Sequence, residues 1–144
     1  MQDRPTSVEL LEAAADFVDR EVIPAIQGAR QFQVRVVANV MRIVAREIQM
    51  EDPVTRNEVK ALAALLGHEK PHLHSLDDLH KTAMKLNEEL SEKIRAGEVD
   101  DGAFRAETLK VVRQAVEDKL RIANPRYIEA DLAARPKTIA NQKG

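Results

Sequence analysis

The sequence predicts an all-α protein: a single-domain bundle of about five helices, with mostly antiparallel neighbours and a loose C-terminal tail. Apolar residues recur at helical spacing along most of the chain, and no segment alternates with the period of two that marks a strand. Capping residues, glycines and prolines divide the chain into segments of ordinary helix length joined by short loops. The 144 residues suit one domain, and a chain of this size holds a core without disulfides or metal.

The first expected helix begins after Thr6, which forms a capping-box pattern with Glu9. It ends or kinks just before Pro24, because proline interrupts the backbone hydrogen bonds of a helix. Gly28 is the turn residue of the connector that follows. The second helix is expected over residues 30–50.

Asp52 followed by Pro53 looks like an N-cap and a first-turn residue, so a separate third helix is expected to start there. It should stop at Gly67, since glycine commonly ends helices. The fourth helix is expected between Ser75, which is placed to cap it, and Gly97.

The fifth helix is expected over residues 103–123, with Asn124 and Pro125 as a firm stop. We assign residues 1–128 to the helical bundle and residues 129–144 to a C-terminal tail that is partly docked or disordered. The last ten residues or so are expected to be loose. The side chains expected to dock the tail are Tyr127, Ile128 and Leu132.

The width of each apolar face predicts which helices are central. Narrow apolar stripes, such as that of the fourth helix, indicate outer helices, whereas the second and fifth helices carry broad apolar arcs, which indicate inner ones. The apolar residues of the second helix are Phe32, Val36, Val37, Val40, Met41, Ile43, Val44 and Ile48.

A polar stripe on this second helix is the first candidate site. It falls within an arc of roughly 60° and consists of Arg35, Asn39, Arg42 and Arg46. We favour a reading in which the stripe is the helix's window to solvent. Two alternatives remain: a cationic groove for a carboxylate or phosphate, which arginine forks suit, and a subunit interface, where arginine is enriched.

Three charged side chains lie within apolar faces and form a second candidate feature. Glu47 lies on the apolar arc of the second helix, Lys119 on that of the fifth, and Glu21 on that of the first. Because a lone buried charge is costly, we expect a contact of Glu47 with Lys119 or with Arg105. Glu21 should pair with an arginine of the second helix. Alternatively, these charged groups reach water at the rim. The predicted ligand-binding residues are Arg35, Asn39, Arg42, Arg46, Glu47 and Lys119.

Other recognisable chemistry is scarce. The loop containing His68, His72 and His74 offers no cysteine and no H-E-x-x-H, and Pro71 prevents Glu69 and His72 from sharing a helical face. We therefore expect no metal and no cofactor. Phosphate-binding and nucleophile motifs are missing, and no catalytic constellation is visible, so we favour a non-catalytic role over an enzymatic one.

Composition narrows the classes of partner. The 22 basic and 24 acidic residues nearly balance, and aromatic residues are few, which argues against nucleic acid and anionic membranes. No apolar run approaches the ~20 residues of a membrane span, and no signal peptide is evident. The lack of cysteine fits the reducing cytoplasm, where we expect the protein.

Four segments carry a resemblance to a known family. The stretches MQDRPTSVELLEA, REVIPAI, RVVANVMRIVARE and KLRIANPRY resemble a bacterial family of uncharacterised function. Its members are typically encoded beside, or fused to, aminoglycoside-phosphotransferase-like kinases, often near acyl-CoA dehydrogenase genes. The resemblance extends to about Tyr127 and implies a setting in small-molecule phosphoryl transfer or acyl-CoA metabolism. The matching segments contain Arg35, Asn39 and Glu47, and Lys119, Asn124, Pro125 and Tyr127.

Two functions follow from these observations. The first is an accessory, non-catalytic domain that binds a kinase-like or acyl-CoA dehydrogenase-like enzyme or itself, as a homo-oligomer that we expect to be a dimer. The second is a bundle that binds a small anionic ligand, with weak enzymatic activity at most. A contiguous exposed apolar patch would favour the first function. A concave pocket lined by the arginine stripe would favour the second.

Overall fold

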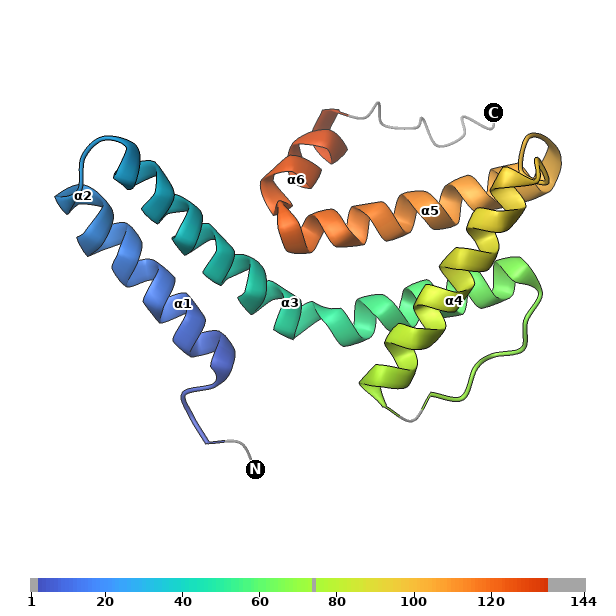
Figure 1. The fold of residues 1–144 in the computed structure, drawn as a ribbon, viewed down its shortest axis with the longest axis horizontal. Coiled ribbons are helices and arrows are strands. Elements are labelled where there is room, and N and C mark those ends of the chain that lie inside the picture. The colour runs from blue at the N-terminus through green and yellow to red at the C-terminus, as the bar shows by residue number, and fades with distance from the viewer. Residues whose placement is uncertain (1–2, 74, 135–144) are drawn as a thin grey trace, which may run out of the picture.

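The computed structural model describes residues 3–73 and 75–134, and every regular element in these two ranges is a helix, which confirms the all-α prediction (Figure 1). In chain order the elements are α1 (Ser7–Phe17), the π-helical turn η1 (Val18–Val22), α2 (Ile23–Ala25), α3 (Ala29–Leu66), α4 (Leu76–Arg95), α5 (Gly102–Ala123) and α6 (Pro125–Ala134). None of the described helices is both long enough and apolar enough to cross a membrane.

The predicted helix ends are largely confirmed. At the start of α1, the Thr6 hydroxyl accepts the Glu9 backbone N–H at 3.2 Å, and the Glu9 carboxylate accepts the Thr6 N–H at 2.7 Å. Ser75 caps α4 by accepting the backbone N–H of Asp78 at 3.0 Å. Gly67 ends α3 with φ of +76°, a left-handed conformation that favours glycine.

The prediction that a separate third helix starts at Asp52 was wrong, because α3 runs unbroken for 38 residues through Pro53. The Asp52 carboxylate does not cap a new helix; it accepts two hydrogen bonds from Arg56, at 2.7 and 2.9 Å, across one helical turn. Pro53 still removes one backbone hydrogen bond, which is the usual cause of a kink. Figure 1 shows α3 changing direction near its middle, so its first half packs with α1 and its second half packs with α4 and α5.

The main core lies between the second half of α3 and α4. Its fully or nearly buried members are Val59, Leu62, Ala63, Leu79, Ala83, Leu86 and Leu90. Leu65, Leu66, Leu73 and Val111 pack against this cluster. The apolar stripe of α4, although narrow, therefore supplies most of the core, and the opposite side of α4 is exposed, as predicted for an outer helix.

The first half of α3 is not an inner helix, which corrects a second prediction. α1 packs along it, and the buried residues of this pair are small: Ala15 on α1, and Ala38 and Ala45 on α3. Six larger apolar residues of this half remain exposed, namely Phe32, Val36, Val37, Val40, Val44 and Ile48, whereas Val34, Met41 and Ile43 are half-buried. A broad apolar arc indicates surface that water disfavours, but it does not say which chain covers that surface.

Of the three side chains predicted to dock the C-terminal segment, the structure describes two, Tyr127 and Ile128. Ile128 is buried, whereas Tyr127 is exposed, so the expectation for Tyr127 was wrong. The side chain of Leu132 and residues 135–144 lie outside the described part of the structure. Helix α6 continues past residue 128, where we had placed the boundary between bundle and tail.

Thr108 on α5 is only 2% exposed, and its buried hydroxyl has no hydrogen-bond partner among the described residues. A buried hydroxyl without a partner costs free energy, and valine has nearly the same shape. We expect Thr108→Val to raise the free energy of unfolding by about 1 kcal/mol. Urea denaturation should show this, while Thr82→Val at a half-buried position of α4 should change stability by less than about 0.5 kcal/mol.

Candidate functional site

The last two arginines of the predicted stripe, Arg42 and Arg46, contact the helices next to α3. Arg42 Nη2 lies 2.9 Å from Asp16 Oδ1 on α1 and 2.7 Å from Asp19 Oδ2 on η1. Arg46 Nε donates to the carbonyl oxygen of Ile122, in the last turn of α5, at 2.7 Å. Such a carbonyl has no partner within its own helix, and the helix dipole favours a cation there.

The environment of Arg42 favours its charged form. Desolvation at this half-buried position acts to lower the pKa of Arg42, but the hydrogen bonds and charges of Asp16 and Asp19 outweigh it, and the pKa is raised above its ordinary value. Glu21 is exposed, and the carboxylates that meet this arginine are Asp16 and Asp19. The prediction that Glu21 pairs with an arginine of the second helix was therefore wrong, because Asp16 and Asp19 pair with Arg42 instead.

The remaining stripe residues, Arg35 and Asn39, are exposed. An open pocket of about 360 Å³ lies beside the stripe. It is lined by Glu12, Asp16, Arg42 and Arg46. Its two cations are matched by two carboxylates, so the pocket carries no clear positive excess. Binding of an anion by these residues stays a prediction.

Removal of the Arg42 side chain should loosen the contact between α1 and α3. We expect Arg42→Ala to lower the free energy of unfolding by about 1 kcal/mol, because it leaves two partly exposed carboxylates close together without their cation. Arg35→Ala, on the exposed surface of the same helix, is the matched control, with an expected change below about 0.5 kcal/mol. Equal melting temperatures for the two variants would contradict this role of Arg42.

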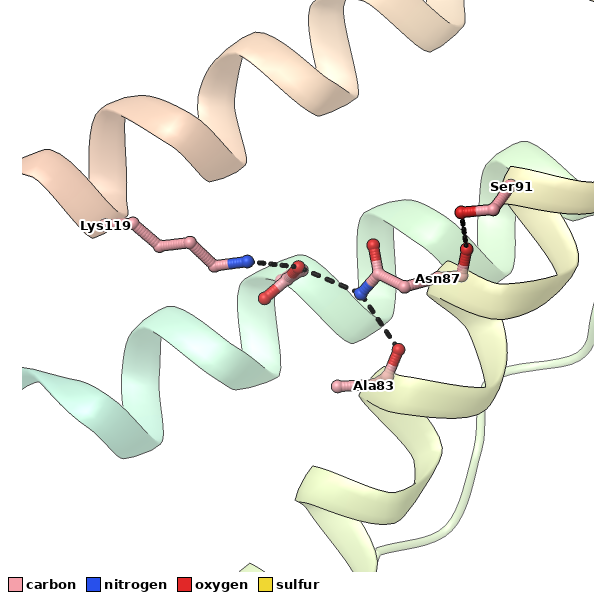
Figure 2. Close-up of polar contacts among 5 residues, drawn as sticks. Ala83, Asn87, Ser91 and Lys119 are labelled. Atoms are coloured by element: carbon pink, nitrogen blue, oxygen red, sulfur yellow. Dashed lines mark hydrogen bonds and ion pairs between the residues drawn. The ribbon is translucent and has the colours of Figure 1, made fainter. Parts of the chain in front are cut away.

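A polar cluster forms around the largely buried Glu58, and it includes Lys119, whose side chain is 65% exposed (Figure 2). The Glu58 side chain is only 9% exposed, and its Oε1 lies 3.3 Å from Lys119 Nζ and accepts Asn87 Nδ2 at 3.1 Å. Asn87 also donates to the carbonyl oxygen of Ala83 at 2.9 Å, and Ser91 donates to that of Asn87 at 2.7 Å. This cluster connects α3, α4 and α5 where they meet.

The predicted partner of Lys119 was therefore wrong. Lys119 pairs with Glu58, Glu47 is exposed, and Arg105 donates to the carbonyl oxygen of Asp100 at 2.8 Å. Sequence reasoning missed Glu58 because it divided α3 at Pro53. In one continuous helix, Glu58 lies five turns beyond Val40 and thus in the same direction, within the apolar arc.

Two of the histidines each pair with one carboxylate. His68 Nε2 lies 2.8 Å from Glu89 Oε2, and His80 Nε2 lies 2.9 Å from Glu51 Oε1. His72 is exposed, and His74 lies outside the described residues. Within residues 3–73 and 75–134, no group of three potential metal ligands comes together.

Two exposed apolar surfaces are the most distinctive feature of the molecule. The open face of α3 consists of Val36, Val37, Val40 and Val44, which are 37–49% exposed. The open face of α5 consists of Leu109, Val112 and Val116, which are 40–56% exposed. Figure 1 shows α1 along one side of α3, while α5 and α6 diverge from its first half. The open face of α3 therefore lacks the cover that α4 provides to its second half.

A protein-family model described as a domain of unknown function (DUF6285) matches residues 24–127, more than two thirds of the chain. The chain belongs to this family. The DUF6285 match contains α3, α4 and α5 complete, and therefore both open faces and the Glu58 cluster, whereas α1 precedes it. Searches of curated proteins and of solved structures found no match to the chain. The function of this DUF6285 domain must therefore be argued from its own surfaces.

Proposed function

We propose that this chain is a non-catalytic interaction domain that associates with a second copy of itself and serves as an accessory to a metabolic enzyme. The observation that supports this proposal is the open face of α3, four valines at helical spacing on one side of a helix. Single exposed apolar residues are ordinary, but contiguous exposed apolar patches usually mark interaction sites.

The polar residues of the chain favour the same proposal. Arg42, Arg46 and Glu58 are each bound by other residues of the chain, and they stabilise contacts between helices. A side chain engaged in this way must lose its partner before it can bind a ligand, which weakens binding. The apolar faces have no such competing partner, so burial against another protein lowers their free energy by about 25 cal/mol for each Å² removed from water.

The proposed setting of this accessory role comes from the resemblance of the four sequence segments. It points to an aminoglycoside-phosphotransferase-like kinase or an acyl-CoA dehydrogenase-like enzyme as the partner. Binding of a small phosphate or carboxylate ligand at the arginine stripe is the alternative, and no contact in the described structure favours it.

Self-association can be measured directly. Light scattering and sedimentation equilibrium over a micromolar concentration series should give a mass twice the 16.1 kDa of one chain. A monomeric mass throughout the series would contradict the self-association on which this proposal depends. The enzyme partner is a separate question: a column carrying the immobilised chain should retain an enzyme of one of the two named classes, identified by mass spectrometry.

A further inference from the structure

We propose that the open face of α3 in one copy packs antiparallel against the open face of α5 in a second copy. In this arrangement, Glu47 forms an ion pair with Arg105 of the partner subunit. The inference rests on the proposed self-association and specifies which surfaces meet and in which register.

The first argument is that the two helices carry matching rows of side chains. The α3 row consists of Val36, Val40, Val44 and Glu47. The α5 row, read toward the N-terminus, consists of Val116, Val112, Leu109 and Arg105. Each row extends over eleven residue steps, about 16 Å along a helix, and stays on one side of it. With Val40 placed opposite Val112, every apolar residue of one row meets an apolar residue of the other, and the two charged residues meet at one end.

The second argument is charge. Glu47 is the acidic end of the α3 row and is exposed. Arg105 is the basic end of the α5 row, and its guanidinium donates to a backbone carbonyl oxygen, that of Asp100, at 2.8 Å. Among the described residues, no carboxylate forms an ion pair with Arg105 and no cation forms one with Glu47. Opposite charges at the edge of an apolar contact fix its register.

The third argument compares this pairing with the pairing of two α3 helices. An antiparallel α3–α3 contact centred on Val40 would place Glu47 opposite Gln33, because both lie seven residues from Val40. It would also leave the open face of α5 in water. A two-fold axis relates α3 and α5 of one copy to α3 and α5 of the other, so the α3–α5 contact between copies occurs twice and covers both open faces of both copies.

The test uses the fact that the chain contains no cysteine. One sample carries Val40→Cys and a second carries Val112→Cys; the two are studied alone and mixed under mild oxidation. Facing residues in packed helices approach within reach of a disulfide, so we expect a covalent dimer in the mixture and none in either variant alone. In the mixture, any link between the two variants is necessarily between chains.

Charge reversal provides a second measurement. Glu47→Arg and Arg105→Glu should each weaken the dimer about tenfold in Kd, and the combined variant should return to within about threefold of the parent, because the pair is restored with opposite sense. The matched controls are Glu88→Arg and Lys85→Glu on the exposed side of α4, which should leave Kd unchanged.

The outcomes separate this inference from the proposed function. A covalent dimer formed by Val40→Cys alone would show α3–α3 pairing and overturn the inference. A dimer by light scattering that no cysteine mixture links would also overturn it, while self-association would stand. A monomer under all conditions would remove the proposed function and this inference together. Losses of affinity that the combined reversal does not restore would contradict the Glu47–Arg105 pair.

Discussion

Replacement of Val40 by aspartate is expected to weaken self-association more than 100-fold. Val40 lies at the centre of the open face of α3, so a carboxylate there would be buried without a partner in an apolar contact. Burial of an unpaired charge costs several kcal/mol, and about 1.4 kcal/mol corresponds to a factor of ten in Kd. Sedimentation equilibrium should therefore show a monomer at concentrations where the parent chain is dimeric.

Met84→Asp is the control for this effect. Met84 is an exposed apolar residue of α4 that belongs to neither open face. The same change at this position should leave Kd within about twofold, because a solvated carboxylate carries no burial cost. Circular dichroism should show equal helix content in both variants. Equal loss of affinity in the two variants would show that α3 has no special part in assembly.

The Leu79→Ala variant is expected to lose about 3–4 kcal/mol of folding free energy. Leu79 on α4 has no exposed surface and belongs to the core cluster with Val59 and Leu62 of α3. Its truncation removes buried methyl and methylene groups and leaves a cavity that packed neighbours fill only in part. Urea denaturation should show this loss as a lower midpoint with an unchanged slope.

The matched control for the core is Leu76→Ala, at a half-exposed position in the first turn of α4. It should cost less than about 1 kcal/mol. Both variants are best measured in the Val40→Asp background, because dimerisation otherwise adds to the apparent stability of the folded chain. Similar losses at Leu76 and Leu79 would contradict the position of the core between α3 and α4.

The helix ends were the part of the fold that the sequence predicted best. Thr6, Ser75, Gly67 and Asn124 each act through their own side chain or backbone conformation, so their effect is local and visible in a single sequence. The failure at Pro53 has the opposite cause. Proline at this point is compatible with either a helix start or a kink, and the packing of both α4 and α5 against α3 decides between them.

In the candidate site, too, features set by local spacing could be predicted, whereas contacts set by packing could not. Periodicity located the arginine stripe and the apolar arc of α3, because direction around a helix follows from spacing. It did not reveal that Arg42 meets Asp16 and Asp19, since that contact depends on how α1 folds back. It also assumed that one chain covers its own apolar surface, and the open face of α3 shows that this assumption was wrong.

The alanine contact between α1 and α3 has a consequence for the dynamics of the chain. Ala15, Ala38 and Ala45 bury little surface compared with the leucines between α3 and α4, so the N-terminal hairpin should open by itself while the rest stays folded. Backbone amides of α1 should then exchange with deuterium faster than those of α4, and dilution to the monomer should widen the difference. The second copy would thus act as an ordering ligand for the hairpin.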